Sequence, residues 1–381
     1  MMRTKTHFSA LTLLAISITA NASEQNSNSD PSGSQNWEIV GQLNEAPGNL
    51  TVTPEGRIIF SVHQHYSPEL RMAELDPSDA TNMIAFPTEA MAMDDPDADL
   101  GLNSVLGVQT DRDGVVWMLD NAMRGGPVPK LVGWKPGPDG GALHQVIYLP
   151  PPAVPEDPFL NDLAVDIARK TIYIADTSRA GRPALVVVNT ETGLARRVLE
   201  NHESVSPEDI PMIAGGEEVA IRRPDGSTFN PKVAVNPIAL DAEGEYLYYG
   251  PMTGTKLFRV STEALRDATL SEAELAESVE FWAERPISDG ISMDIDGNIY
   301  ISAVANNEIG VIPADTRTYQ SLIRDEMISW PDAFSFAPDG YLYAVVNQLH
   351  KGPLLNAGND VSEPPYLIIR FKPLAPGVIG R

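Results

Sequence analysis

Cysteine is absent from the 381-residue sequence, and basic residues are few. Without a thiol the chain can form neither a disulfide bond nor a cysteine nucleophile, and it cannot carry a lipid on cysteine. The 27 Lys and Arg residues stand against 52 Asp and Glu residues, which gives a formal net charge of −25. Because such a charge is repelled by phosphate groups, it excludes nucleic acid and anionic membrane surfaces as partners.

Long apolar runs are missing too. The run LTLLAISITA follows Arg3 and Lys5 and leads into a small-residue site, ANA, that ends at Ala22. This order is typical of a signal peptide, and the run is too short to cross a bilayer. We therefore expect residues 1–22 to direct export to the periplasm or the extracellular space, without membrane insertion. The polar stretch 23–36 predicts a flexible leader.

Common catalytic motifs are absent as well. The sequence has no Gly-x-Ser-x-Gly elbow, no phosphate-binding P-loop and no Gly-rich dinucleotide fingerprint. Serine hydrolases of the elbow type and the corresponding nucleotide-binding enzymes are therefore excluded. No motif assigns a catalytic residue, so the catalytic residues, if there are any, stay unknown at this point.

One short motif looks like a calcium loop. Asp294-x-Asp296-Gly297-Asn298 has acidic residues before a glycine, as an EF-hand loop does. With Gly297 at the sixth position, however, the loop would end at Ala303, which has no carboxylate to bind the ion. Alternating apolar residues flank the motif on both sides, and this favours the turn of a β-hairpin.

What the sequence does contain is one pattern repeated six times. Each copy is a short alternating strand, a turn and a second strand rich in Ile, Val, Tyr and Trp, and two more strands follow most copies. The copies are residues 47–62, 104–119, 161–176, 236–250, 289–302 and 332–346. Four-stranded units at spacings of roughly 40 to 75 residues are typical of propeller blades.

The two ends of the repeat region complement each other. The sixth copy is followed by one clear strand, YLIIRFK, while WEIVGQL at 37–43 precedes the first copy and has no blade of its own. Pairing the two would complete the sixth blade and leave no open sheet edge. The sequence therefore predicts an all-β, six-bladed propeller over residues 37–381, a single domain closed by its N-terminal strand. Residues 203–235 predict a loop excursion on one face.

The residues that open the first strand of each blade are expected to meet at one mouth of the central channel. Asn161, Asn236, Asp289 and Asp332 are such residues, and we predict that they bind a small-molecule ligand. Glu45 precedes the first copy and would add a carboxylate. A ring of carboxylate and amide oxygens also suits calcium or another divalent cation. The alternative is that each side chain only satisfies nearby backbone groups at a strand entry.

Other polar and aromatic residues near these positions have two interpretations each. His63 and His65 lie on one face of the second strand of blade one, a spacing that can bind a transition metal or mark an exposed strand face. Trp330 directly precedes an opening position and could flank the channel mouth, but core packing is its favoured interpretation. Asn347 ends a second strand, where it could reach an internal ligand or hold a loop.

Five segments together resemble the major royal jelly protein/yellow family. They are SVLGVQTDRDGVVWMLDNA with KLVGWK, FLNDLAVD with IYIADTS and ALVVVNTETGLARRVLENH, NPIALDAEGEYLYYGPMTGTKLFRVSTEALRD, SDGISMDIDGNIYIS, and WPDAFSFAPDGYLYAVVNQL. They cover nearly the whole chain after the leader, in the order of the family's blades. The resemblance implies a secreted six-bladed propeller with a small-molecule site in its channel. Members include carriers of small amines or sterols and proteins credited with dopachrome conversion.

The expected fold is also similar to that of gluconolactonase-type and paraoxonase-type lactone hydrolases. In those enzymes a Glu, two Asn and an Asp bind calcium or another divalent ion, and the matching positions here are Glu45, Asn161, Asn236 and Asp289. The metal would polarise a lactone carbonyl while a carboxylate acts as the base. We therefore carry three predictions forward: a small-molecule carrier, a metal-dependent lactone hydrolase, and a tautomerase-like enzyme. The sequence decides neither the ligand nor the oligomeric state.

Overall fold

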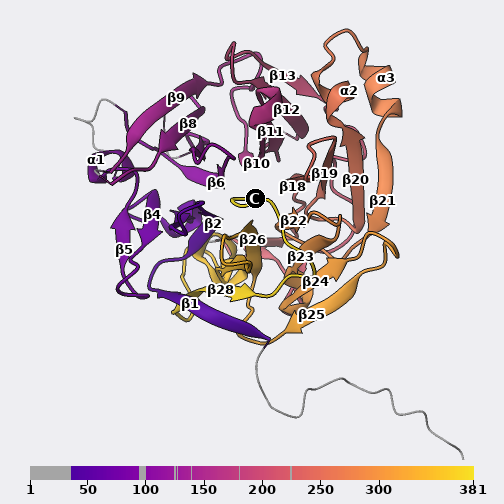
Figure 1. Ribbon diagram of the computed structural model, residues 1–381. Coiled ribbons are helices and arrows are strands. Elements are labelled where there is room, and N and C mark those ends of the chain that lie inside the picture. The colour runs from indigo at the N-terminus through magenta and orange to yellow at the C-terminus, as the bar shows by residue number, and fades with distance from the viewer. Residues whose placement is uncertain are drawn as a thin grey trace, which may run out of the picture. The chain divides into compact units, whose positions relative to one another are not determined.

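Six four-stranded antiparallel sheets surround a central axis and form a six-bladed β-propeller (Figure 1). The structure is a computed structural model that describes residues 36–93, 100–123, 126, 128–138, 140–179, 181–223 and 225–381. Asn36–Arg381 forms one compact unit. The predicted signal peptide and the predicted leader up to residue 35 lie outside the described residues. The all-β propeller predicted from the repeats is thus confirmed.

The blades follow one another along the chain. Blade one is β2 (Pro47–Val52), β3 (Ile58–Val62), β4 (Met72–Leu75) and β5 (Met83–Ala85), and blade two is β6 (Val105–Thr110), β7 (Val116–Asp120), β8 (Lys130–Lys135) and β9 (Ala142–Tyr148). Blade three is β10 (Leu160–Asp166), β11 (Thr171–Asp176), β12 (Ala184–Asn189) and β13 (Ala195–Val198). Blade four is β18 (Val235–Leu240), β19 (Tyr246–Pro251), β20 (Lys256–Ser261) and β21 (Glu280–Glu284), and blade five is β22 (Ile291–Met293), β23 (Ile299–Ala303), β24 (Glu308–Ile312) and β25 (Gln320–Arg324).

Blade six contains strands from both ends of the described chain. It is β26 (Pro331–Phe336), β27 (Leu342–Val346), β28 (Tyr366–Phe371) and, on the outside, β1 (Trp37–Leu43). β1 pairs antiparallel with β28, from Trp37 opposite Phe371 to Leu43 opposite Tyr366. The predicted closure by the N-terminal strand is therefore confirmed.

Short helices and additional strands join or cover the blades. The α-helices are α1 (Glu89–Ala92), α2 (Thr262–Arg266) and α3 (Glu272–Glu277), and the 3-10 turns are η1 (Gln64–Tyr66), η2 (Ile167–Arg169), η3 (Val304–Asn306), η4 (Leu349–Lys351) and η5 (Pro353–Leu355). The predicted excursion at 203–235 carries two small hairpins, β14 (Ile213–Ala214) with β15 (Glu217–Glu218) and β16 (Ile221–Arg222) with β17 (Thr228–Phe229). Within the described residues, no helix has the length and apolar character to span a membrane.

The calcium-like motif is a hairpin turn of blade five, as expected. Gly297 has φ +82°, a conformation that glycine adopts without steric strain. One oxygen of Asp294 accepts hydrogen bonds from the backbone N–H groups of Asp296 and Asn298, and the other accepts one from the Tyr300 hydroxyl at 2.9 Å. The Asp294 carboxylate is thus occupied by the turn itself.

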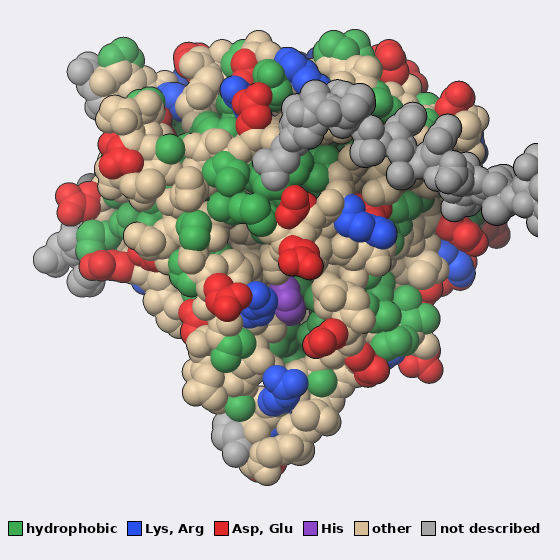
Figure 2. Space-filling view, turned by 90° about the horizontal axis from the view of Figure 1, so that it is seen from below, with side chains coloured by type: hydrophobic (Ala, Val, Ile, Leu, Met, Phe, Trp, Pro, Cys, Tyr) green, Lys and Arg blue, Asp and Glu red, His purple; other side chains and the backbone are tan. Residues whose placement is uncertain are grey.

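The core lies between neighbouring blades and is rich in aromatic and branched side chains. One cluster joins blades three and four around Tyr173 and Tyr249, and another joins blades five and six around Tyr300 and Phe336. Trp117 is fully buried in blade two. Acidic side chains are spread over the face shown in Figure 2, with fewer basic ones between them, in keeping with the net charge.

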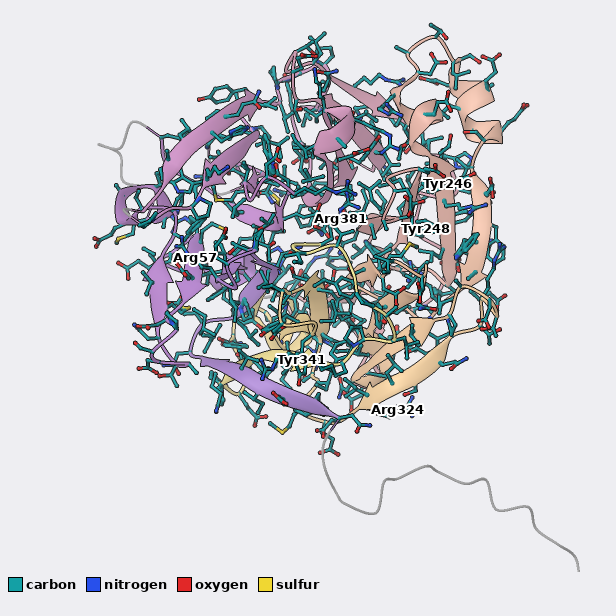
Figure 3. The ribbon with its side chains drawn as sticks, in the orientation of Figure 1. Arg57, Tyr246, Tyr248, Arg324, Tyr341 and Arg381 are labelled. Carbon is teal, nitrogen blue, oxygen red and sulfur yellow. The ribbon has the colours of Figure 1, made fainter. Side chains whose placement is uncertain are left out.

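The last residues of the chain close the channel at the end where the innermost strands finish. Residues 374–381 hydrogen-bond to a residue in or just after the innermost strand of every blade: Thr51, Thr110, Val165, Asp241, Ile295 and Phe336. The guanidinium of Arg381 donates to the carbonyls of Asp241 at 2.9 Å and Val165 at 3.1 Å. Figure 3 places Arg381 near the centre of the ring. The channel is therefore blocked at this end.

Candidate functional site

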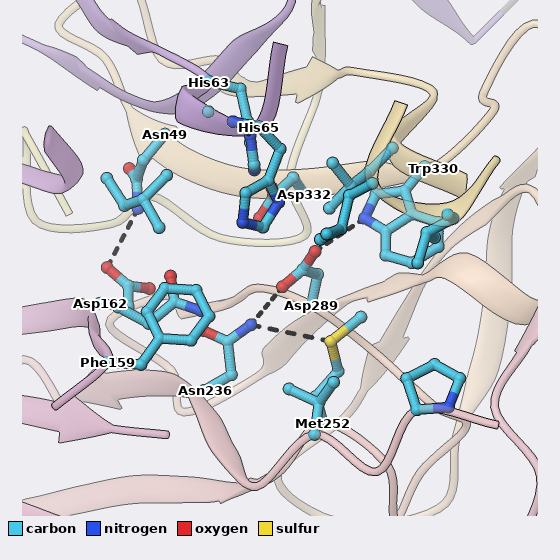
Figure 4. Close-up of a pocket in the computed structure, with 18 of the residues that line it drawn as sticks. Asn49, His63, His65, Phe159, Asp162, Asn236, Met252, Asp289, Trp330 and Asp332 are labelled. Atoms are coloured by element: carbon cyan, nitrogen blue, oxygen red, sulfur yellow. Dashed lines mark hydrogen bonds between the residues drawn. The ribbon is translucent and has the colours of Figure 1, made fainter. Parts of the chain in front are cut away.

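A cavity of about 150 Å³ lies at the opposite end of the channel, where the innermost strands begin (Figure 4). Its polar side is built mainly by Asn49, Asn161, Asp162, Asn236, Asp289 and Asp332, together with His63 and His65. Its apolar side comes largely from the excursion and from the segment after β27, through Met212, Ile221, Val233, Leu349, Leu354 and Leu355. A polar group of converging side chains thus faces an apolar wall within one cavity.

The four residues predicted to bind the ligand all line this cavity. Asn161, Asn236, Asp289 and Asp332 come from blades three to six and converge as the repeat pattern implies. Glu45 is not among the lining residues; the pKa of its carboxyl is raised by burial and by the charge of Glu69. The cavity therefore assembles three of the four predicted metal ligands.

The innermost strands are irregular where they reach the cavity. In blades one, two, three, four and six the pairing register shifts near the strand start, for example between Leu160 and Leu163. Such a bulge re-aims side chains and lets neighbouring residues point to the same side. In blade three, Asn161 and Asp162 both line the cavity as a result. In blade one, Asn49 reaches it beside Gly48.

Asp289 is held by two side-chain donors. The indole Nε1 of Trp330 donates to Oδ2 at 2.7 Å, and the Nδ2 of Asn236 donates to Oδ1. Burial raises the pKa of Asp289 to about 6, and the two donors act against this rise because they stabilise the charged form.

Asp162 and Asp332 are the other two carboxyls of the cavity. Burial is the main cause that raises the pKa of Asp162 to about 7, and the charge of Asp289 adds to it. Asp162 accepts hydrogen bonds from the amide of Asn49 at 3.0 Å and from the backbone of Leu163 at 2.8 Å. The pKa of Asp332 is raised well above its ordinary value by burial and by the charges of both other carboxyls. Because of repulsion and desolvation, part of this group of three carboxyls stays protonated near neutral pH.

The two histidines follow β3 and lie across the cavity from Asp162 and Asn236 in the view of Figure 4. Their ring centroids are 4.8 Å apart, and the Nδ1 of His63 accepts a hydrogen bond from the backbone of His65 at 3.2 Å. Burial lowers the pKa of His63 well below its ordinary value and that of His65 to about 4. Both imidazoles are therefore neutral at pH 7.

The donor set differs from what a divalent cation requires. In the part of the chain that the structure describes, no group of three or more His, Cys, Asp or Glu side chains is spaced to hold a metal ion. Asn236 turns its amide nitrogen, not its carbonyl oxygen, toward the Asp289 carboxylate. This arrangement does not fit a calcium cage. The predicted set of Glu45, Asn161, Asn236 and Asp289 stays a prediction that a metal analysis can test.

Some functional candidates were missed or undervalued at the level of sequence. Asn49 and Asp162 stand one residue after an opening position, where strict alternation would turn them away from the channel. The polar pair Asn161-Asp162 interrupts that alternation and was the available signal. Trp330, expected in the core, is buried but also contributes to the cavity wall. The side-chain amide of Asn347 donates to the Asp332 carboxyl at 2.9 Å, and Asn347 itself does not line the cavity.

A sequence model of the family described as "Major royal jelly protein" matches residues 103–363, which is more than half of the chain. Comparison of the sequence with curated proteins gives no significant match.

Several solved structures share the fold. A gluconolactonase from Xanthomonas campestris has a TM-score of 0.54 at 12% identity, covering 88% of this chain and 89% of that one. A luciferin-regenerating enzyme has a TM-score of 0.56 at 11% identity, covering 90% and 97%. The PQQ-bound aldose sugar dehydrogenase from Streptomyces coelicolor has a TM-score of 0.51 at 12% identity, covering 88% and 97%. At these identities the likeness is one of fold.

Proposed function

The chain belongs to the major royal jelly protein family, and on that premise we propose that it binds a small organic molecule in the cavity at the channel mouth. The ligand has an apolar body and a head group that is cationic or rich in hydrogen-bond donors. The observation that carries the proposal is the convergence of three carboxyls opposite an apolar wall: Asp289, which is buried, and Asp162 and Asp332, which are half-buried.

The three carboxyls favour a cationic head group. Burial raises the pKa of all three, and the charges of neighbouring carboxyls raise those of Asp162 and Asp332 further. A cation among them would offset both effects, since an opposite charge nearby stabilises the ionised form. The neutral imidazoles of His63 and His65 add no positive charge that would compete with it.

The apolar side of the cavity favours a ligand with an apolar body. Phe159, Met252 and Leu355 line the cavity together with branched residues of the excursion. Contacts of this kind supply affinity by removing apolar surface from water, while the few polar groups fix the orientation. A small molecule with an aromatic or aliphatic body and an amine at one end satisfies both sides.

Proton transfer within a bound molecule is the second candidate function, and one observation favours it. The pKa values of Asp162 and Asp289, about 7 and about 6, lie in the range in which a carboxyl exchanges protons readily at neutral pH. A tautomerase-like reaction would need this property, with one carboxyl accepting a proton and another returning it. Lactone hydrolysis requires in addition a bound metal ion, which removal of divalent cations by a chelator tests.

A thermal-shift screen of the chain from residue 23 tests binding directly. Amines, quinones and sterols of matched size are compared at neutral pH. The proposal predicts that amines raise the melting temperature, because a ligand that binds only the folded state stabilises it. A set of hits confined to uncharged sterols or quinones would contradict the cationic head group, and the absence of hits in all classes would contradict binding at this cavity.

We also propose that the protein acts outside the cytoplasm, because residues 1–22 have the pattern of a signal peptide. Expression of the full chain in a bacterial host with a periplasm should give a processed protein whose first residue is Ser23. Intact-mass measurement of the fractionated protein checks this, and an unprocessed cytoplasmic product would contradict it.

A further inference from the structure

Trp330 has a backbone conformation that its residue type disfavours. Its φ is +59°, in the left-handed region, where glycine and asparagine are common and a bulky side chain is rare. Pro331 follows it, and a residue before proline prefers extended conformations. A bulky side chain and a following proline both disfavour the left-handed φ at position 330, yet the residue there is tryptophan, the largest of the amino acids.

Hydrogen bonds from the neighbouring strand end hold this conformation. The carbonyl of Trp330 accepts from the backbone of Asn347 at 3.2 Å, and the carbonyl of Ser329 accepts from the backbone of Gln348 at 3.0 Å. Gln348 is itself left-handed, with φ +53°. Left-handed non-glycine residues persist where the surrounding structure over-determines them, and they cluster at functional sites.

The indole makes three kinds of contact at once. Its Nε1 donates to Asp289 at 2.7 Å, and one face stacks on His350 with ring centroids 5.7 Å apart and planes 11° apart. The side chain is 2% exposed and packs with Met212, Met252 and Leu355, which also line the cavity. Figure 4 shows Trp330 beside Asp289, with its nitrogen toward the carboxylate.

We propose that Trp330 is a positioning residue that fixes the Asp289 carboxylate in the cavity and thereby determines the selectivity of the site for a positively charged head group over a neutral one. This inference rests on the proposed small-molecule function. A carboxylate oxygen has two acceptor positions, so the bonds from Trp330 and Asn236 leave each oxygen of Asp289 able to accept from a ligand. Without the indole donor, Asn236 alone holds the carboxylate, and its charged form loses a stabilising bond. A role restricted to core packing would require the apolar ring alone.

The test compares Trp330→Phe with a matched control, Trp117→Phe. Trp117 is also fully buried, its Nε1 also donates to an aspartate, Asp111, at 2.8 Å, and its ring also contacts a histidine, His144, at 5.8 Å. Neither Trp117 nor Asp111 lines the cavity. Both substitutions keep an aromatic ring and delete one indole donor to a carboxylate, and they differ in whether that carboxylate belongs to the site.

Phenethylamine and its neutral counterpart phenethyl alcohol are the probes, and the quantity measured is the ratio of their dissociation constants. A hydrogen bond to a charged group corresponds to roughly a tenfold effect or more. We expect Trp330→Phe to reduce the wild-type preference for the amine about tenfold while the affinity for the alcohol stays within about twofold. Trp117→Phe should keep the wild-type ratio even if it unfolds more easily. An unchanged ratio in Trp330→Phe would overturn the inference.

The outcomes separate this inference from the function on which it rests. If the wild-type protein binds neither probe, the proposed function fails for this ligand class and takes the inference with it. If the wild type prefers the amine and Trp330→Phe shows the same preference, only the role of Trp330 fails. Should Trp330→Phe not fold, His350→Ala provides the comparison, because it removes the ring behind the indole and leaves the donor in place. The preference should then fall about twofold, and an unaltered preference would count against the inference.

Discussion

Asn49 donates its side-chain amide to the carboxyl of Asp162 at 3.0 Å and so joins blade one to blade three across the channel. Both residues line the candidate cavity, and both also line a chamber of about 20 Å³ that Arg381 borders. The bond therefore lies at the floor of the cavity. Below it, residues 374–381 close the channel, so the proposed site is a blind pocket with its entrance on one face.

Replacing Asn49 with Ala should destabilise the protein in a pH-dependent way. At pH 8 Asp162 is ionised and loses its side-chain donor, which costs roughly 1.5–3 kcal/mol for a bond to a charged group. At pH 5 the carboxyl is protonated, because its pKa is about 7, and the loss should be smaller. Urea unfolding at the two pH values measures the difference.

A suitable control for that variant is Asn82→Ala. The amide of Asn82 donates to Asp76, also at 3.0 Å, but on the surface. Exposed interactions contribute little, so this change should cost much less than Asn49→Ala at pH 8. Equal losses for Asn49→Ala at pH 5 and pH 8 would contradict the raised pKa of Asp162.

The cluster of carboxyls should make the stability depend on pH with a definite sign. The ordinary pKa of aspartate is 3.8, and in the folded protein those of Asp289 and Asp162 rise to about 6 and about 7, with Asp332 raised well above its ordinary value. Between these limits the folded state binds more protons than the unfolded chain, so stability from this group is present at low pH and is lost as the pH rises through the folded-state values. His63 and His65, with lowered pKa values, act in the opposite direction below pH 6.5.

Asp332→Asn isolates the contribution of the carboxyls. The variant removes one titrating carboxyl and its repulsion of the other two, so it should lose less stability than the wild type between pH 5 and pH 8. Melting temperatures recorded across that range for both proteins give the comparison. A larger loss in the variant than in the wild type would show that Asp332 stabilises the folded protein as an anion, which is incompatible with a raised pKa of its carboxyl.

The tail that seals the channel offers a test of the closed end. Gly380 has φ +89°, and a Cβ added there would lie 2.5 Å from the carbonyl oxygen of Thr110. Gly358 has φ +86° with nothing near its Cβ position. Gly358→Ala therefore measures the backbone strain alone, about 1 kcal/mol, while Gly380→Ala adds displacement of the tail. We expect Gly380→Ala to melt at a lower temperature than Gly358→Ala. Equal melting temperatures would argue against close packing of residues 374–381 in the channel.

Removal of divalent cations decides between the ligand site and the metal-dependent hydrolase. Because the donors around Asp289 are arranged for hydrogen bonding, a chelator should leave the melting temperature unchanged and added calcium should not raise it. Metal analysis of the purified protein accompanies the melting curves. Near-stoichiometric calcium together with a fall in melting temperature on chelation would favour lactone hydrolysis through Glu45, Asn161, Asn236 and Asp289.

The fold was largely predictable because propeller strands leave a strong local signal. Alternating apolar residues and a glycine turn recur in most copies, and Gly56, Gly244, Gly297 and Gly340 all have the positive φ that such turns need. The strand at 37–43 had no blade of its own and the sixth blade lacked a strand, and together these two features predicted how the ring closes. Each strand and turn depends on neighbours in the sequence, which is why the pattern detects it. The closure joins strands more than 300 residues apart and followed from counting the strands of each blade.

The site was predictable only in part, because its remaining features depend on long-range contacts. Asn161, Asn236, Asp289 and Asp332 follow from the repeat alone. The bulge that turns Asp162 into the cavity, and the 113-residue separation between Asn49 and Asp162, have no periodic signal. The tail bonds to residues up to 329 positions away, from Gly380 to Thr51. The left-handed conformation of Trp330 contradicts its local preference, and the sequence favoured the core over the channel mouth for this residue.

Calorimetric titration of phenethylamine into the wild type and into Asp289→Asn tests the central claim most directly. The control is Asp294→Asn, which removes a buried carboxylate from the hairpin turn of the same blade, outside the cavity. The account predicts saturable binding to the wild type, a loss of roughly tenfold or more in Asp289→Asn, and little change in Asp294→Asn. Equal affinity of the amine for wild type and Asp289→Asn would contradict it.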